Sequence, residues 1–142
     1  MTAAQSSWTV TIRLAQATGS ESTALGSIAL YSNTTGNNNV AVGRLALYSN
    51  TTASENTAVG YQALYANTTG AQSTAIGSYA LDSVTTGNEN TAVGYQAGNT
   101  ATTAAANSLF GRLAGRDTTG SYNTFLGHNS GYQITTGSKN TV

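Results

Sequence analysis

The side chains that could carry chemistry are few in this sequence, and they are widely spaced. The only histidine is His128, and no acidic residue stands at a spacing from it that would indicate a catalytic triad or a zinc site. Glu21, Glu55 and Glu89 recur at an even interval along the chain. If 17 residues form one coil of a repeat, these carboxylates are two coils and about 10 Å apart, which is too far for one calcium ion. We therefore predict no catalytic residue, no metal site and no cofactor.

The composition excludes several further classes of site. Only 7% of the residues are charged, with five basic and five acidic side chains, and Arg44, Arg112 and Arg116 are too scattered for a nucleic-acid patch. The chain has no cysteine, which excludes disulfides and thiolate metal sites. The glycine-rich stretches lack the lysine of a phosphate-binding loop. Neither the long apolar run of a membrane-spanning helix nor a signal peptide is present, so we expect no membrane insertion.

Tyrosines are the remaining candidates for ligand contact. Tyr31, Tyr48 and Tyr65 are evenly spaced, and Tyr61 and Tyr95 add to the aromatic surface. Such a ladder could dock sugar rings or protein, because tyrosine offers amphipathic contact area at low entropic cost. The alternative, which we favour, is that the rings stack between coils and stabilise the structure.

These residues are positioned by a repeat that runs through almost the whole chain. One glycine recurs with a period of 17, shortened to 16 in the last interval: Gly26, Gly43, Gly60, Gly77, Gly94, Gly111 and Gly127. A Thr-Thr pair recurs in step, as in Thr68-Thr69-Gly70. The glycines, threonines and asparagines of each unit are poor helix formers, and a fixed period indicates a solenoid. The sequence predicts an all-β fold, a parallel β-solenoid of about seven 17-residue coils over residues 17–142.

Each coil is expected to contain two short strands. The first is Asn56-Thr57-Ala58-Val59 in the third coil, and the second covers Gln62-Ala63-Leu64-Tyr65. With strands about 4.8 Å apart, seven coils would form a rod roughly 35 Å long. The position that opens the first strand is polar in every coil, and an asparagine there can bond its own turn and the next coil. This structural ladder comprises Asn39, Asn56, Asn90, Asn107, Asn123 and Asn140.

The first strand is apolar at two adjacent positions, and adjacent side chains of a strand point to opposite faces. We assign Leu25, Val42, Val59, Ile76, Val93, Phe110 and Leu126 to the interior of the roll. The other apolar face then needs a cover, and a second copy of the chain could provide it. We therefore predict an obligate oligomer whose interface contains Ala24, Ala41, Ala58, Ala75, Ala92, Leu109 and Phe125.

Residues 1–16 stand outside the repeat. Trp8 to Leu14 alternates apolar with polar residues, which is typical of a half-buried strand. This strand could cap the first coil or bind a partner. At the other end, Asn140-Thr141-Val142 stops inside a strand, which suggests end-to-end assembly. The residues expected in that contact are Trp8, Val10, Ile12, Leu14, Thr141 and Val142.

The unit Asn-Thr-Ala-Val-Gly-Tyr-Gln-Ala-Leu at 56–64 resembles the repeats of trimeric phage tail fibres. It is also similar, more distantly, to the head repeat of YadA-type trimeric adhesins. The resemblance covers about residues 17–142. It implies a homotrimer of left-handed parallel β-rolls exposed on a virion or cell surface. The period of 17 is longer than that of the adhesin repeat, and the adhesins' coiled-coil stalk and membrane anchor have no counterpart here.

Three functions from different classes follow. The first is a rigid fibre or adhesin segment, extracellular or on a virion, built as a homotrimer and able to bind a cell-surface glycan or a protein receptor. The second is a subunit of a head-to-tail extracellular filament. The third is an ice-binding solenoid, suggested by the Thr-Thr ladder, although such faces usually require Thr-x-Thr on a flat strand.

Overall fold

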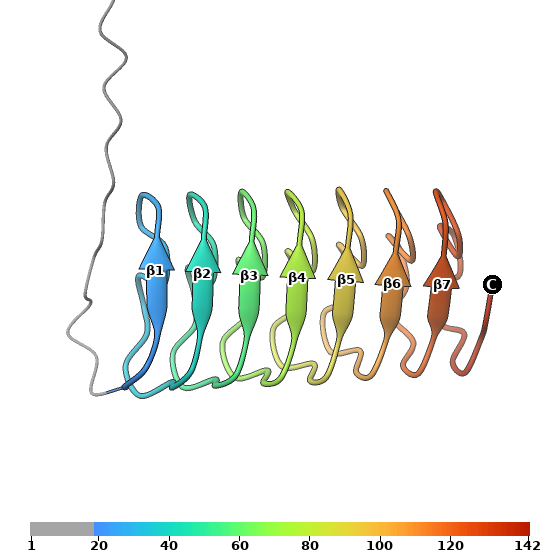
Figure 1. The fold of residues 1–142 in the computed structure, drawn as a ribbon. Helices are drawn as coiled ribbons and strands as arrows, with labels where there is room; N and C mark the ends of the chain where they lie inside the picture. Colours follow the sequence, from blue (N-terminus) through green and yellow to red (C-terminus); the bar gives the residue numbers. More distant parts are fainter. Residues whose placement is uncertain (1–18) are drawn as a thin grey trace, which may run out of the picture.

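The computed structural model describes residues 19–142, which form one continuous solenoid of short parallel strands (Figure 1). The strands are short and pair in sequence order, each with the next coil's strand. Their bounds are β1 Thr23–Leu25, β2 Val40–Val42, β3 Thr57–Val59, β4 Thr74–Ile76, β5 Thr91–Val93, β6 Ser108–Phe110 and β7 Thr124–Leu126. The prediction of an all-β parallel solenoid with 17-residue spacing is confirmed.

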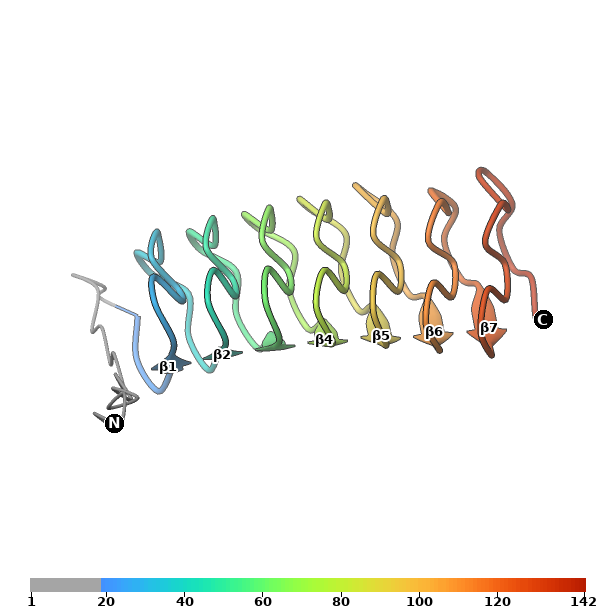
Figure 2. The same cartoon turned by 90° about the horizontal axis from the view of Figure 1, so that it is seen from above.

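The register of the sheet follows the period of the sequence. Ala58 of β3 pairs with Ala75 of β4, and the same one-coil step holds at every pair. The shortened coil keeps this register, because Leu109 of β6 still pairs with Phe125 of β7. The missing residue is therefore absorbed by the turns. Seen from above, the coils form a row with the strands along one side (Figure 2).

The predicted second strand is wrong: that part of each coil is a chain of turns. In the third coil, Gln62 and Leu64 have positive φ values of 56° and 51°, in the left-handed region that an extended strand cannot contain. The coils are nevertheless joined there by backbone hydrogen bonds. The Leu64 amide donates to the Ala80 carbonyl at 3.0 Å, and the Ala66 amide to the Asp82 carbonyl at 2.9 Å. Stacking of identical turns thus satisfies the backbone where no sheet forms.

The interior of the roll is filled by the alanine ladder, so the predicted assignment of the two strand faces was inverted. Ala41, Ala58, Ala75 and Ala92 are fully buried within a single chain, as are Leu109 and Phe125 of the later coils. These side chains have no surface to offer a second copy, and the predicted interface through them is wrong. The physical reason is space: two walls of a narrow roll approach so closely that only a methyl group fits opposite the leucines at positions 47 and 64.

The large apolar side chain that fills the core comes from the turn in the first coils and from the strand in the last coils. In the first four coils a strand alanine accompanies a buried leucine in the turns: Leu30, Leu47, Leu64 and Leu81. In the later coils that turn position is Gly98, Gly115 and Gly131. A Cβ on Gly98 would lie 2.7 Å from Leu109 Cδ1 and 2.8 Å from Leu81 Cδ2, so neighbouring leucines already occupy that space. Leu109 and Phe125 therefore replace the turn leucines of the sixth and seventh coils. In the fifth coil, where the strand residue is Ala92, the space beside Gly98 is filled by Leu81 and Leu109 of the adjacent coils.

Two asparagine ladders close the turns. Asn56 Nδ2 donates to the Gly70 carbonyl at 2.9 Å, and Asn56 Oδ1 accepts from the Ser73 amide at 2.9 Å in the next coil. A second ladder was missed by the sequence interpretation: Asn50 Nδ2 donates to Asn33 Oδ1 at 2.8 Å and to the Ala53 carbonyl at 3.0 Å. Asn50 and Asn56 are fully buried, so these coils are fastened both to themselves and to their neighbours.

Candidate functional site

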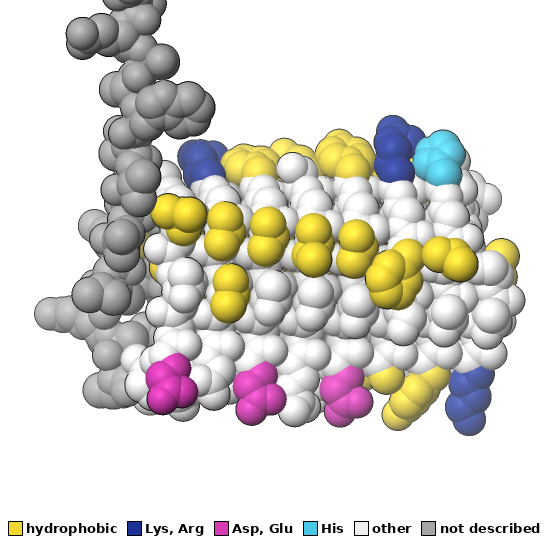
Figure 3. Space-filling view, in the orientation of Figure 1, with side chains coloured by type: hydrophobic (Ala, Val, Ile, Leu, Met, Phe, Trp, Pro, Cys, Tyr) yellow, Lys and Arg dark blue, Asp and Glu magenta, His cyan; other side chains and the backbone are white. Residues whose placement is uncertain are grey.

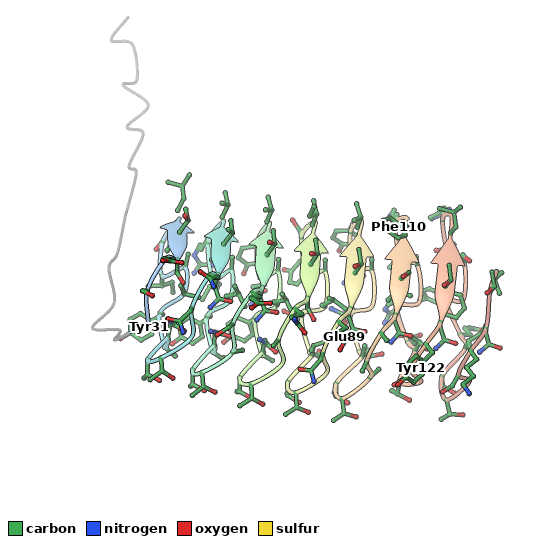
Figure 4. The ribbon with its side chains drawn as sticks, turned by 60° about the horizontal axis from the view of Figure 1, so that its bottom comes forward. Tyr31, Glu89, Phe110 and Tyr122 are labelled. Atoms are coloured by element: carbon green, nitrogen blue, oxygen red, sulfur yellow. The ribbon has the colours of Figure 1, made fainter. Side chains whose placement is uncertain are left out.

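The side chains that point out of the sheet form a row that we call the outward ladder. Adjacent side chains of a strand point to opposite faces, so Val59 faces away from the roll because Ala58 faces its interior. The same arrangement holds in every coil. Ile76 is 41% exposed, Phe110 40% and Leu126 73%, and these residues are informative because they lie together in one row. Figure 3 shows the ladder as a row of hydrophobic side chains across one face, and Figure 4 marks Phe110 on β6. Its members are Leu25, Val42, Val59, Ile76, Val93, Phe110 and Leu126.

A second outward row runs beside the ladder and is mainly hydroxylic. Thr57, Thr74 and Thr91 stand two positions before the ladder residues and pair in register from coil to coil. Val40 takes this place in the second coil and Ser108 in the sixth. No residue of the seven strands is charged. The strand face is therefore a flat, neutral surface with one apolar and one mainly threonine row.

The tyrosine ladder stacks on itself. The rings of Tyr31 and Tyr48 are 5.3 Å apart with an interplanar angle of 6°, and those of Tyr48 and Tyr65 are 5.3 Å apart at 13°. The ring faces between coils are thus in contact with each other rather than open to a sugar. The next residue in this row is Asp82, whose Oδ1 is buried and accepts no hydrogen bond within residues 19–142. Burial raises the pKa of the Asp82 carboxyl above its usual value.

A different set of aromatic and basic side chains follows the ends of the strands. Tyr61 and Tyr79 pack edge to face with centroids 5.2 Å apart, and Tyr79 packs on Tyr95 in the same way at 6.1 Å. Desolvation, and then the neighbouring Tyr61, raise the pKa of the Tyr79 hydroxyl above its usual value. The guanidinium of Arg44 lies 5.6 Å from the centroid of Tyr61, and that of Arg112 lies 5.8 Å from that of Tyr95.

His128 belongs to this edge. Its Nε2 lies 2.9 Å from Nη1 of Arg112, and its side chain is exposed. Within residues 19–142 no group of three or more His, Cys, Asp or Glu side chains is close enough to hold a metal ion. The arrangement therefore offers a hydrogen-bonding and cationic surface around the imidazole.

Acidic side chains occupy the opposite edge of the sheet. Glu21, Glu55 and Glu89 each stand two residues before the start of a strand, and all three are exposed. Figure 3 shows acidic side chains along one edge of the face, and Figure 4 marks Glu89 before β5 and Tyr122 before β7. Among the described residues, one side-chain hydrogen bond of these carboxylates joins Glu55 Oε2 to Gln72 Nε2 at 3.0 Å. Isolated carboxylates of this kind keep a turn solvated.

Of the residues predicted to join one chain end to end with the next, only Thr141 and Val142 lie within the described part of the chain. Trp8, Val10, Ile12 and Leu14 lie outside the described residues. Thr141 forms a parallel bridge with Thr124, and the Val142 amide donates to the Thr124 carbonyl at 3.0 Å. Residues 140–142 thus extend the roll beyond β7 in the same register.

Comparison with protein families, with curated proteins and with solved structures finds no match for this chain. Its function is therefore inferred from the fold and from the surfaces described above. No helix capable of crossing a membrane occurs between residues 19 and 142.

Proposed function

We propose that this chain is a non-enzymatic structural protein, a rigid rod that associates side by side with further copies of itself through the outward ladder. The supporting observation is the ladder itself: a line of apolar side chains along all seven strands of a single chain, the largest of them well exposed. Apolar surface arranged in one continuous row marks an interaction site more than scattered exposed residues do.

A second copy is the partner whose geometry fits best. The rungs of the sheet repeat at about 4.8 Å, and only a partner with the same repeat can place an apolar side chain against every rung. Another copy has that repeat, and side chains of facing sheets then interdigitate in a dry contact. The strands carry no charged residue, so association of the faces buries no charge and costs no ionic desolvation.

The cellular context that we propose follows the sequence resemblance to trimeric tail fibres and adhesins. A homotrimer would place three outward ladders around a shared axis parallel to the rod. An extracellular or virion fibre of this kind has to keep its shape without a large core. Stacked turns and buried asparagine ladders would supply the rigidity that this requires. Binding of a surface glycan or protein receptor is a further part of this proposal.

The test compares Ile76→Lys with Thr69→Lys, which introduces the same charge at an exposed turn of the preceding coil. Light scattering should give an oligomeric mass for the unmodified chain and for Thr69→Lys. Ile76→Lys should shift the mass toward one chain, because a lysine in the ladder would be buried without a partner. Equal masses for the two variants would contradict the proposal. Electron microscopy separates short rods from the long polymers expected for a head-to-tail filament.

One observation favours ice binding as a second candidate. The strand face presents Thr-x-Val and Thr-x-Ile in register, as at Thr57 and Val59 and at Thr74 and Ile76, so hydroxyl and methyl groups form regular rows on a flat surface. This surface could order water only if it stays uncovered. Thermal hysteresis in a cooling assay, abolished by Thr74→Lys, would support this function, and freezing without hysteresis would eliminate it.

A further inference from the structure

We propose that the aromatic and basic edge of the rod binds a linear acidic polysaccharide. The edge consists of side chains that follow the strands of successive coils: Arg44, Tyr61, Tyr79, Tyr95, Arg112 and His128. Figure 3 shows basic, hydrophobic and histidine side chains in a row along this border of the sheet, beside the outward ladder and separate from it. The site does not require self-association and is present on a single rod.

The edge is continuous because each member contacts the next. Arg44 Nη1 donates to the Tyr61 hydroxyl at 3.3 Å, and the three tyrosines pack edge to face. The row continues through the guanidinium of Arg112 over Tyr95 to the imidazole of His128. These contacts restrain long side chains before any ligand arrives, so less conformational entropy is lost on binding.

The cations of this edge are not neutralised by the protein. Among residues 19–142 the only ion pair joins Arg116 to Asp117, with Nε and Oδ1 3.4 Å apart, whereas Arg44 and Arg112 are exposed and face tyrosines. A guanidinium that stacks on a ring keeps its outer N–H groups available for a carboxylate or sulfate. The acidic side chains Glu21, Glu55 and Glu89 occupy the other edge and do not compete.

The spacing of the charges favours a polysaccharide over a nucleic acid. Arg44 follows β2 and Arg112 follows β6, four rungs apart, which corresponds to about 19 Å. A nucleic acid carries a phosphate on every residue and is bound by a denser row of cations. A polysaccharide in which uronic acids alternate with neutral sugars can place a carboxylate at each arginine and lay the intervening sugar rings against the amphipathic tyrosines, of which Tyr95 is 43% exposed.

The experiment measures binding of hyaluronan, in which a uronic acid alternates with a neutral sugar, to the full chain by titration calorimetry, with dextran as a neutral polymer and oligothymidylate as a nucleic acid. Arg44→Gln/Arg112→Gln is compared with Arg116→Gln/Lys139→Gln, which removes the same charge from other parts of the rod. Hyaluronan should bind more tightly than either other polymer. The first double variant should weaken hyaluronan binding about tenfold or more, and the second about twofold or less.

Tyr95→Ala provides an independent readout at an exposed ring and should weaken hyaluronan binding severalfold without changing the circular dichroism of the rod. Equal effects of the two double variants would overturn the proposal, because binding would then be unspecific electrostatic attraction. So would equal affinity for hyaluronan and dextran, tighter binding of oligothymidylate, or no binding of hyaluronan. Loss of self-association in Arg44→Gln/Arg112→Gln would also overturn it, since the edge would then be covered by the acidic edge of another copy.

Discussion

At the scale of single residues, the narrow roll depends on backbone conformations that most residues avoid. Each coil contains a glycine with positive φ and also residues with side chains in the left-handed region, such as Glu55, Gln62 and Leu64 in the third coil. A left-handed conformation costs about 1–2 kcal/mol for a residue with a Cβ. The asparagine ladders and stacked turns offset that cost, and the left-handed positions are therefore places where stability can be gained.

Ala106 is a left-handed residue with φ of 56° and only a methyl group as side chain, and Ala105 beside it is not left-handed. Ala106→Gly should raise the free energy of unfolding by about 0.5–1 kcal/mol, because relief of strain exceeds the added entropy of the unfolded chain. Ala105→Gly should lower it by about 0.5–1 kcal/mol. Urea denaturation measures both, and stabilisation by Ala105→Gly as large as that by Ala106→Gly would contradict the strain argument.

Asp82 should make the stability of the rod depend on pH. Burial raises the folded-state pKa of the Asp82 carboxyl above its usual value. The folded state then binds a proton more readily than the unfolded state, so its contribution is complete below the unfolded pKa and is lost as pH rises through the folded pKa. Asp82→Asn should therefore raise the melting temperature at pH 7 and change it little at pH 3. A larger gain at pH 3 than at pH 7 would contradict this account.

At the scale of the coil, the sequence predicts the repeat and the strand register but not which side of each strand faces the core. The spacing of the glycines predicts the period, the position of each strand and the register, because a parallel stack repeats its pairing with its sequence. It does not decide which apolar row points inward. Alternation places Ala58 and Val59 on opposite faces of the strand but does not say which face is the interior. Hydrophobicity favours the larger residue inside, which is the wrong prediction here.

The limited space inside the roll places the smaller residue, alanine, in the interior. Leu47 and Leu64 already fill the interior from the turns, so the strand contributes only a methyl group and the bulkier valine lies outside. The sequence does carry this information, in the coils where Leu109 or Phe125 accompanies a glycine in the turn. The false second strand has a different origin. Gln62 and Leu64 are left-handed although neither is the glycine or asparagine that usually indicates such a position.

The exchange of volume between strand and turn predicts a compensating pair in the last coil. Phe125→Ala should cost about 3–5 kcal/mol by leaving a cavity. Gly131→Leu alone should also destabilise the rod, because a Cβ there would collide with the Phe125 ring. Together they recreate the alanine and leucine of the first four coils, where Leu30 and Leu47 adopt a similar positive φ. Chemical denaturation of all four proteins should give a favourable coupling of about 1–3 kcal/mol, and strictly additive losses would contradict the exchange.

At the scale of the whole molecule, the rod separates three surfaces that run along its length. The outward ladder is apolar, one edge carries the tyrosines and arginines, and the other carries the glutamates (Figure 3). The outward ladder is apolar in every coil, so a partner with a matching repeat gains a similar contact at every rung. The edges vary from coil to coil, and a linear polymer along the aromatic and basic edge would meet arginines only at β2 and β6.

The central claim is that the outward ladder is covered by another copy, and sedimentation equilibrium of the unmodified full chain tests it most directly. One chain has a mass of 14.4 kDa. At micromolar concentration and moderate salt, we predict a single species whose mass is an integral multiple of that value, with three chains expected from the resemblance to trimeric fibres. A species of one chain that persists as the concentration is raised to about a millimolar, where even weak specific interfaces associate, would contradict the account.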